Sequence, residues 1–312
     1  MMKHTDSFLM QPRVQLPQQH GVLVLNKPSG PSSARCLTML KRLGQKKIGH
    51  AGTLDPMASG VLLVLLGHAT KISGHLMADG GKTYQGELCL GQTTDTWDAE
   101  GTVLAEQPWE QVTEDDVRRE IAAWHGVSEQ PVPPISAAKH EGQPLYKLAR
   151  AGKDVPEKSK VIEISLAEVL GIALPLARFR VSCSSGTYIR SLAHSLGMRL
   201  QCGAVLTELT REYSHPFGLA QAHSLQDILD DPESLPARVL PVTAALPHWP
   251  VVTVAAAHEP DLRNGRPLPC GAGAPDVDKV VLLSEAGTPL ALALRAEEDG
   301  RMCWTVLRGL WN

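Results

Sequence analysis

Hydrophobic and polar residues repeat along the chain in two ways, and each repeat predicts a type of secondary structure. Apolar residues dominate the start of GVLVLNKPSG (21–30) and all of VLLVLL (61–66), while they alternate with polar ones in KTYQGELCLG (82–91), which predicts three strands. Helical spacing with a hydroxyl residue before it and a glycine after it predicts capped helices over 32–44 and 113–126. Residues 179–200 are expected to run strand, turn, helix.

The same pattern divides the chain into regions. The first twenty residues form a separate N-terminal extension, and 127–160, rich in Pro, Lys and Gly, predicts a long exposed loop with little core. VTAALPHWP (242–250) is a plausible linker, and the remaining residues to 312 predict a small β-rich module. Because strands and helices mix without a regular βαβ rhythm, we expect an α+β fold with a mixed, mostly antiparallel central sheet flanked by helices.

Composition narrows the class of protein. The chain has 312 residues, of which 43% are hydrophobic and 20% charged, as in soluble globular proteins. Its six cysteines are scattered without a C-x-x-C pair, so we expect neither a metal site nor disulfides, and a reducing cytoplasm as the location. The N-terminus lacks the apolar region of a signal peptide, and the longest aliphatic run is too short to span a membrane.

A formal net charge of −3 conceals an uneven distribution of charge. Residues 27–82 contain eight Lys or Arg and two acids, whereas 85–131 contain eleven acids and two arginines. The segment 178–212 is basic again, with five arginines against two glutamates. Basic segments that converge in space could follow a nucleic-acid backbone, although ordinary solvated surface charge is an equally good interpretation at this point.

Asp55 is the one acid in GHAGTLDPMASG (49–60), and two interpretations of it compete. Asp before Pro is a favoured helix start, which would occupy the carboxylate with backbone amides. However, PMASG (56–60) is too short for a helix before the next strand begins, which leaves the carboxylate available for chemistry. The nearby GGKT (80–83) is not a phosphate-binding loop, because Leu76 stands where the first glycine is required and a strand follows.

Four motifs in order carry a family resemblance. GVLVLNKPSGPSS, GHAGTLDPMASGVLLVLLGHATK, KTYQGELCLGQTTDTWDAEG and CSSGTYIRSLAHSLG resemble the TruB family of tRNA pseudouridine synthases, over about residues 21–220. The resemblance implies a catalytic domain at 21–247 with the pseudouridine synthase fold and an RNA-gripping thumb at about 127–160. It also implies a PUA-like RNA-binding domain at 248–312.

The resemblance assigns catalytic roles to three residues. Asp55 matches the catalytic aspartate, which acts at the ribose, at the base, or by elimination to a glycal. Tyr84 matches the tyrosine that stacks on the base and is a candidate base for proton removal, whereas the strand pattern alone favours a core aromatic. Arg190 matches the arginine that pairs with the aspartate and keeps it ionised, whereas by itself it would be a phosphate contact or a surface residue.

RNA-binding roles follow from the same matches. His50 matches the histidine that helps to extrude the target base, although a turn residue bonded to backbone is its ordinary interpretation. Three positions depart from the family pattern, and Ser195, Thr210 and His215 put some RNA contacts and a local turn in doubt. The residues expected to contact substrate are His50, Tyr188, Lys27, Leu209, Arg211, Lys139 and Lys147.

The implied activity is conversion of the T-loop uridine at position 55 of tRNA to pseudouridine, with base flipping and no metal, nucleotide or redox cofactor. We expect a monomer that binds the T-arm stem-loop without an obligate protein partner. Two other classes stay open on sequence: an RNA-binding protein without catalysis, and a hydrolase with a phosphoryl-accepting Asp55. The second would need a magnesium site, and no second acid lies near Asp55 in sequence.

Overall fold

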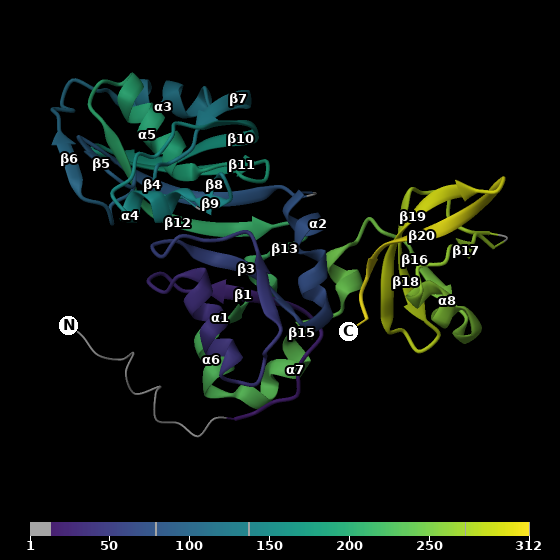
Figure 1. The fold of residues 1–312 in the computed structure, drawn as a ribbon. Helices are drawn as coiled ribbons and strands as arrows, with labels where there is room; N and C mark the ends of the chain where they lie inside the picture. The colour runs from purple at the N-terminus through teal and green to yellow at the C-terminus, as the bar shows by residue number, and fades with distance from the viewer. Residues whose placement is uncertain (1–13, 79, 137, 272, 312) are drawn as a thin grey trace.

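The computed structural model describes residues 14–78, 80–136, 138–271 and 273–311, and a large mixed sheet forms its centre. Figure 1 shows this sheet beside a smaller C-terminal one, drawn in yellow and green. The central order is β14 (His223–Ser224), β1 (Gly21–Lys27), β3 (Ser59–Leu66), β12 (Ala204–Ser214), β4 (Lys82–Leu90), β11 (Leu176–Cys183), β10 (Ser159–Ala173) and β7 (Gly126–Pro131). Beside it, β2 (Ile48–Ala51) pairs with β3, β13 (Phe217–Gly218) with β12, and β15 (Val239–Leu240) with β1.

The strand directions confirm the expected mixed, mostly antiparallel sheet. The β1–β14 and β3–β12 pairs are parallel, and the other pairs along the main order are antiparallel. Smaller ribbons join β5 (Gln92–Thr94) to β6 (Val103–Glu106) and β8 (Lys139–His140) to β9 (Gln143–Pro144). The β3–β12 pair is short, with Thr210 opposite Ser59 and Arg211 opposite Gly60.

Both faces of the central sheet are buried at β1 and β3, which explains the uninterrupted apolar runs of these two strands. One face packs with α1 (Ser33–Lys41), α3 (Glu114–Ala122), α5 (Ile189–Arg199) and α6 (Leu225–Asp230). The other packs with η2 (Gly67–Ile72), α2 (Ser73–Ala78) and η5 (Val242–Ala245). Before the C-terminal module, the described part of the chain also contains the short helices α4 (Leu145–Arg150), α7 (Leu235–Arg238), η3 (Leu219–Gln221) and η4 (Pro232–Ser234).

The predicted helix starts are confirmed at the level of single hydrogen bonds. The Ser32 hydroxyl accepts from the Arg35 amide at the start of α1, 3.2 Å away. Thr113 caps α3 with a reciprocal capping box, in which the Asp116 carboxylate accepts from the Thr113 amide. Local chemistry therefore determines where these helices begin.

The prediction of a long loop over 127–160 was wrong at both of its ends. Residues 127–131 belong to β7, which pairs with the start of β10. The Gln130 side chain accepts a hydrogen bond from the Tyr188 amide and donates one to the Tyr188 carbonyl, at 2.8 and 3.0 Å. β7 therefore positions the start of α5. The sequence carries no local signal for this strand, because its pairing partner β10 lies about thirty residues further along the chain.

The C-terminal module, residues 251–309, has its own sheet in the order β16 (Val251–Val254), β18 (Lys279–Ser284), β19 (Pro289–Glu298), β20 (Arg301–Gly309) and β17 (Leu268–Pro269). The short helices η6 (Ala256–His258) and α8 (Glu259–Arg263) lie within it. This β-rich part agrees with the expectation. In the described part of the chain, no helix is long and apolar enough to cross a membrane.

The segment predicted as a linker is instead part of a hydrophobic interface between the central sheet and the C-terminal module. Leu246 and Trp249 are 5% and 8% exposed, and they belong to a cluster that also contains Leu292 and Leu310 of the C-terminal region. Lys71 of η2 donates across the same interface to the carbonyls of Gly309 and Trp311. The C-terminal module is therefore packed directly on the central sheet.

Candidate active site

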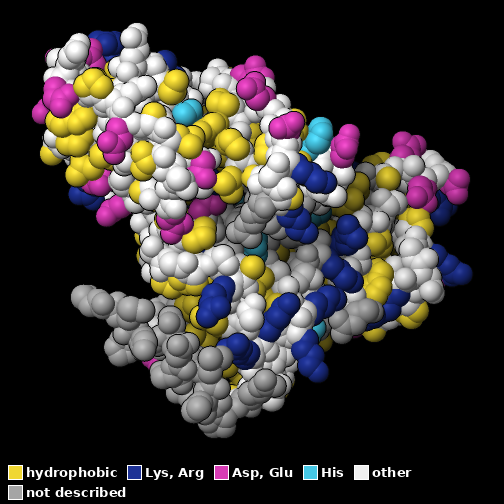
Figure 2. Space-filling view, turned by 60° about the vertical axis from the view of Figure 1, so that its left-hand side comes forward, with side chains coloured by type: hydrophobic (Ala, Val, Ile, Leu, Met, Phe, Trp, Pro, Cys, Tyr) yellow, Lys and Arg dark blue, Asp and Glu magenta, His cyan; other side chains and the backbone are white. Residues whose placement is uncertain are grey.

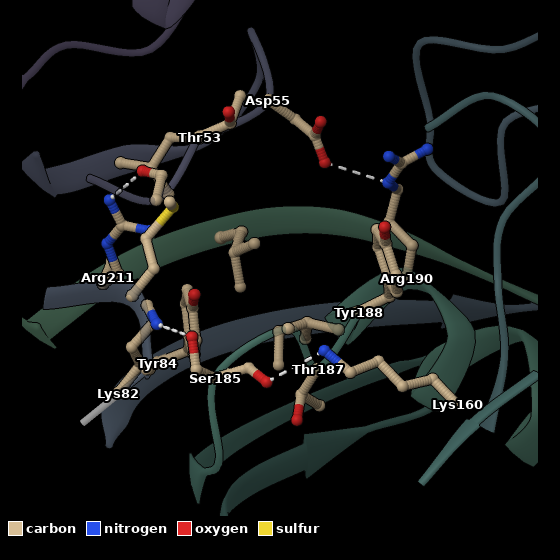
Figure 3. A pocket seen from close by; sticks show the side chains of 17 residues that line it. Thr53, Asp55, Lys82, Tyr84, Lys160, Ser185, Thr187, Tyr188, Arg190 and Arg211 are labelled. Carbon is tan, nitrogen blue, oxygen red and sulfur yellow. Dashed lines mark hydrogen bonds and ion pairs between the residues drawn. The ribbon is translucent and has the colours of Figure 1, made fainter. Parts of the chain in front are cut away.

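Asp55 lies in an open turn between β2 and β3, and it does not begin a helix. Residues 56–58 form a single turn closed by a bond from the Ala58 amide to the Asp55 carbonyl, 3.2 Å long. The Asp55 carboxylate instead faces Arg190, with Oδ2 2.9 Å from Nε, and 37% of its side chain is exposed. The helix-cap interpretation therefore fails, and the carboxylate is open to a ligand (Figure 3).

Arg190 is a buried cation held in place from several directions. It follows Tyr188 at the start of α5, and its side chain is 6% exposed. Its Nη1 and Nη2 donate to the carbonyls of Thr96 and Ile135, at 2.8 and 3.2 Å. These main-chain contacts leave the Nε edge of the guanidinium turned toward Asp55, so the ion pair has a defined geometry.

A second carboxylate, Asp98, lies on the same edge of Arg190. Its Oδ2 is 3.6 Å from Arg190 Nε, and only 6% of its side chain is exposed. Oδ1 accepts from the Thr96 hydroxyl and the Glu100 amide, at 2.6 and 3.1 Å. Arg190 therefore stays paired with Asp98 if Asp55 swings toward a substrate.

Tyr84 and Arg211 form the opposite side of the site. Tyr84 is 6% exposed on the buried face of β4, and the Arg211 guanidinium lies over its ring, 6.0 Å from the centroid. Burial raises the pKa of the Tyr84 phenol, so the hydroxyl is neutral at neutral pH. A neutral, fixed ring suits stacking on a base better than it suits removal of a proton by a phenolate.

These residues surround one cavity of about 520 Å³, which is large enough for a nucleoside. Figure 3 shows Asp55 and Arg190 on one side of it, and Lys82, Tyr84 and Arg211 on the other. Tyr188 and Leu209 also line the cavity, as expected. The structure thus brings together Asp55, Tyr84 and Arg190 from three distant parts of the chain.

Arg211 and Lys27 are both buried, with different consequences for their expected contacts. Arg211 lines the cavity, so its contact with substrate stays a prediction, whereas Lys27 is buried away from the cavity and the expected RNA contact was wrong. Arg211 is fully buried and donates to the carbonyls of Val61 and Gly52, at 2.7 and 2.9 Å. Lys27 is fully buried too, and its Nζ donates to the carbonyls of Pro28, Pro56 and Ala58. Through these hydrogen bonds to main-chain carbonyls, both cations fix the backbone on either side of Asp55.

Replacing Lys27 by Met is expected to lower the free energy of unfolding by about 2–4 kcal/mol, because three buried carbonyls would lose a charged donor. Urea unfolding followed by circular dichroism measures the loss. The exposed Lys46 is the matched control, and Lys46→Met should change the free energy of unfolding by less than about 0.5 kcal/mol. Equal stability of the two variants would contradict the supporting role of Lys27.

The other expected contacts are distributed unevenly. His50 of β2 is outside the set of described residues that line the cavity, and burial followed by the Arg211 charge lowers the pKa of its imidazole. Lys147 is exposed on α4, where it is free to meet a phosphate. Lys139 lies in β8, and its side chain is outside the described part of the structure.

Two residues of the site were missed by sequence reasoning. Asp98 lies in the polar segment after β4, where its carboxylate resembles those of neighbouring solvated acids. Lys82 precedes the predicted Tyr84 by two positions, and strand alternation places the two on the same face of β4. That alternation was a usable signal for Lys82, whereas the approach of Asp98 to Arg190 was visible only in three dimensions.

Comparison with known proteins gives consistent matches. A family model described as TruB family pseudouridylate synthase (N terminal domain) matches residues 40–189. The tRNA pseudouridine synthase B of Nitratidesulfovibrio vulgaris is 65% identical over 301 residues, 95% of this chain and 99% of that protein. The tRNA pseudouridine synthase B of Oleidesulfovibrio alaskensis is 62% identical over 303 residues, 95% of this chain and 98% of that protein. In the crystal structure of a Cbf5-Nop10-Gar1 complex, one chain is similar with a TM-score of 0.69 and 26% identity, covering 97% of this chain and 88% of that chain.

Proposed function

Because this chain belongs to the TruB family of tRNA pseudouridine synthases, we propose that it acts on the T-loop uridine at position 55 of tRNA. Its activity is tRNA pseudouridylation, an isomerisation that replaces the N1–C1′ bond of a uridine by a C5–C1′ bond. The single observation that best supports the proposed chemistry is the ion pair of Asp55 with the buried Arg190 at the edge of a nucleoside-sized cavity.

Each part of the site has a role in the proposed reaction. The uracil stacks on the Tyr84 ring, and flipping it from the folded T loop costs a few kcal/mol that RNA contacts must offset. Asp55 acts as the carboxylate that receives C1′, takes a ribose proton, or adds to the base. Arg190 holds the Asp55 carboxylate in one orientation beside the substrate.

The charge distribution over the surface supports a polyanionic substrate. Figure 2 shows Lys and Arg side chains gathered over the middle and lower part of one face, with Asp and Glu mainly toward its upper and right-hand edges. Burial, and after it the nearby charges of Lys47 and Arg308, lowers the pKa of the Lys71 ammonium, so these three cations lie close together. We propose that this face, together with the exposed Lys147, contacts the phosphates of the T-arm, and that the chain acts as a monomer without a protein partner.

Incubation of the pure protein with an unmodified tRNA transcript tests the proposal. We expect pseudouridine at position 55 alone, together with release of tritium from a substrate labelled at C5 of uridine, because C5 loses its hydrogen when it bonds to C1′. A transcript with cytidine at position 55 is the control and should release no tritium. Binding without tritium release would favour an RNA-binding protein without catalysis, and pseudouridine at another position would refute the T-loop assignment.

A further inference from the structure

One buried cation of the cavity has no role in the chemistry described so far. The Lys82 side chain points into the cavity, the residue is 7% exposed, and its Nζ donates to the Ser185 hydroxyl at 2.8 Å. Arg211 differs from it, because the Arg211 guanidinium is committed to two main-chain carbonyls. Lys82 is therefore the buried amine of the cavity that can turn toward a ligand by exchanging a single hydroxyl contact.

The fold brings Lys82 to the side of the cavity opposite Arg190. Strand alternation aligns Lys82 with Tyr84 on β4, so the amine lies beside the ring on which a base would stack. A Cβ added to Gly52 would be 3.4 Å from Lys82 Cε and 3.5 Å from Arg211 Nη1. The two cations thus both lie beside Gly52, three residues before Asp55. Asp55 lies across the cavity from them, with its carboxylate turned toward Arg190.

The proposed reaction moves negative charge toward this side. When the N1–C1′ bond breaks, its electron pair stays on the uracil, and the charge spreads over N1, O2 and O4. The Asp55 carboxylate loses its charge by bonding to C1′ or by taking a ribose proton. Addition of Asp55 to the base would likewise leave an anionic ring. In each route one negative charge passes from Asp55 to the uracil, until C5 bonds to C1′, the C5 proton leaves and N1 takes up a proton.

We propose that Lys82 is a further catalytic residue, whose ammonium stabilises the anionic uracil between cleavage of the N1–C1′ bond and formation of the C5–C1′ bond. This inference rests on the proposed pseudouridylation. A cation fixed in a site sheltered from water stabilises a developing charge far better than one in solvent. Arg190 orients the Asp55 carboxylate, and Lys82 stabilises the negative charge on the leaving uracil.

The neighbours of Lys82 set the pH range in which it carries its charge. Burial, followed by the Arg211 charge from β12, lowers its pKa to about 8. Of the smaller influences, Cys183 of β11 acts in the opposite direction and the Lys160 charge from β10 in the same direction. Cys183 and Tyr84 stay neutral there, since burial raises the pKa of the thiol to about 11 and that of the phenol as well. Lys82 is thus a cation below about pH 8 and loses its charge above it.

A second lysine near Ser185 provides the contrast. Lys160 also lines the cavity, but it is exposed, and its Nζ donates to the Ser185 carbonyl at 3.2 Å. A phosphate of the RNA backbone can reach the exposed Lys160 from solvent, whereas the buried Lys82 is accessible only to a group that enters the cavity. The two lysines therefore predict different effects on substitution.

The test compares kcat/KM for tRNA across about pH 6 to 9 in the wild-type protein and in Lys82→Met. We expect the wild-type value to be level at low pH and to fall above about pH 8, approaching tenfold per pH unit. Lys82→Met should be about 10²- to 10³-fold slower at pH 7 and lack this decline. Lys82→Arg should retain more activity than Lys82→Met at pH 9, because its charge persists.

Lys160→Met is the matched control, and filter binding of tRNA separates affinity from rate. Lys160→Met should lower the slope of log affinity against log salt by about 1. It should keep the decline but move it to somewhat higher pH, because the Lys160 charge no longer lowers the pKa of Lys82. Lys82→Met should bind tRNA within about threefold of wild type. A wild-type profile without a decline, a decline that survives in Lys82→Met, or a loss confined to affinity would each overturn the role of Lys82. A wild-type protein that forms no pseudouridine would instead refute the proposed function.

Discussion

Asn in place of Asp55 is expected to lower the rate of pseudouridine formation by roughly 10⁴-fold or more, because an amide is neither a nucleophile nor a base. The exchange keeps the size of the side chain, and Arg190 still has Asp98 as a partner, 3.6 Å away. The fold and the affinity for tRNA should therefore change little. Single-turnover tritium release measures the rate, and filter binding measures the affinity.

The control for this variant is an acid outside the cavity. Asp115 is exposed in the first turn of α3, and Asp115→Asn should retain the wild-type rate. If Asp55→Asn kept more than about a hundredth of the wild-type rate, Asp55 would not be the reacting carboxylate. If it lost tRNA binding as well, its carboxylate would be part of the binding surface.

Lys in place of Arg190 is expected to lower kcat by about 10²-fold or more while leaving the protein folded. An ammonium keeps the charge, but it cannot donate to the carbonyls of Thr96 and Ile135 and face Asp55 together. The Asp55 carboxylate would then lose its defined orientation. Pre-steady-state tritium release at saturating tRNA measures this loss separately from binding.

Gln in place of Arg190 should have the larger effect on stability. It would leave the buried Asp98 without a cation, at a cost of about 3–5 kcal/mol in the free energy of unfolding. Arg199 of the same helix is the control: it pairs with Glu120 at the surface, so Arg199→Lys should cost less than about 1 kcal/mol and leave kcat unchanged. An Arg190→Lys protein with wild-type kcat would show that charge alone suffices at this position.

Much of the local structure was predictable from the chain because its causes are local. The alternation in β4 predicted both the strand and the shared face of Lys82 and Tyr84. Ser32 and Thr113 marked the helix starts, since a hydroxyl that accepts from an amide three residues ahead needs no tertiary contact. The family motifs pointed to Asp55, Tyr84 and Arg190 before their proximity was visible.

Other features depended on partners far away in sequence. β7 exists because β10 pairs with it, and the segment at 242–250 is buried because the C-terminal module covers it. The basic character of Lys27 suggested RNA, yet its ammonium binds carbonyls that lie about thirty residues ahead. Charge in a sequence does not reveal whether a side chain ends in solvent or under a loop.

The sequence alone determined the element types, the helix caps and the family, because these depend on residue order and on contacts within a few positions. Only the tertiary structure decided that Asp55 meets Arg190 instead of capping a helix, and that Asp98 shares this arginine. It also placed Lys82 across the cavity from Asp55 and Arg190. The physical reason is that these side chains come from positions far apart in the chain: the turn before β3, the start of β4, the segment after β5, and α5. Their charges act on one another only after the sheet has closed and excluded water.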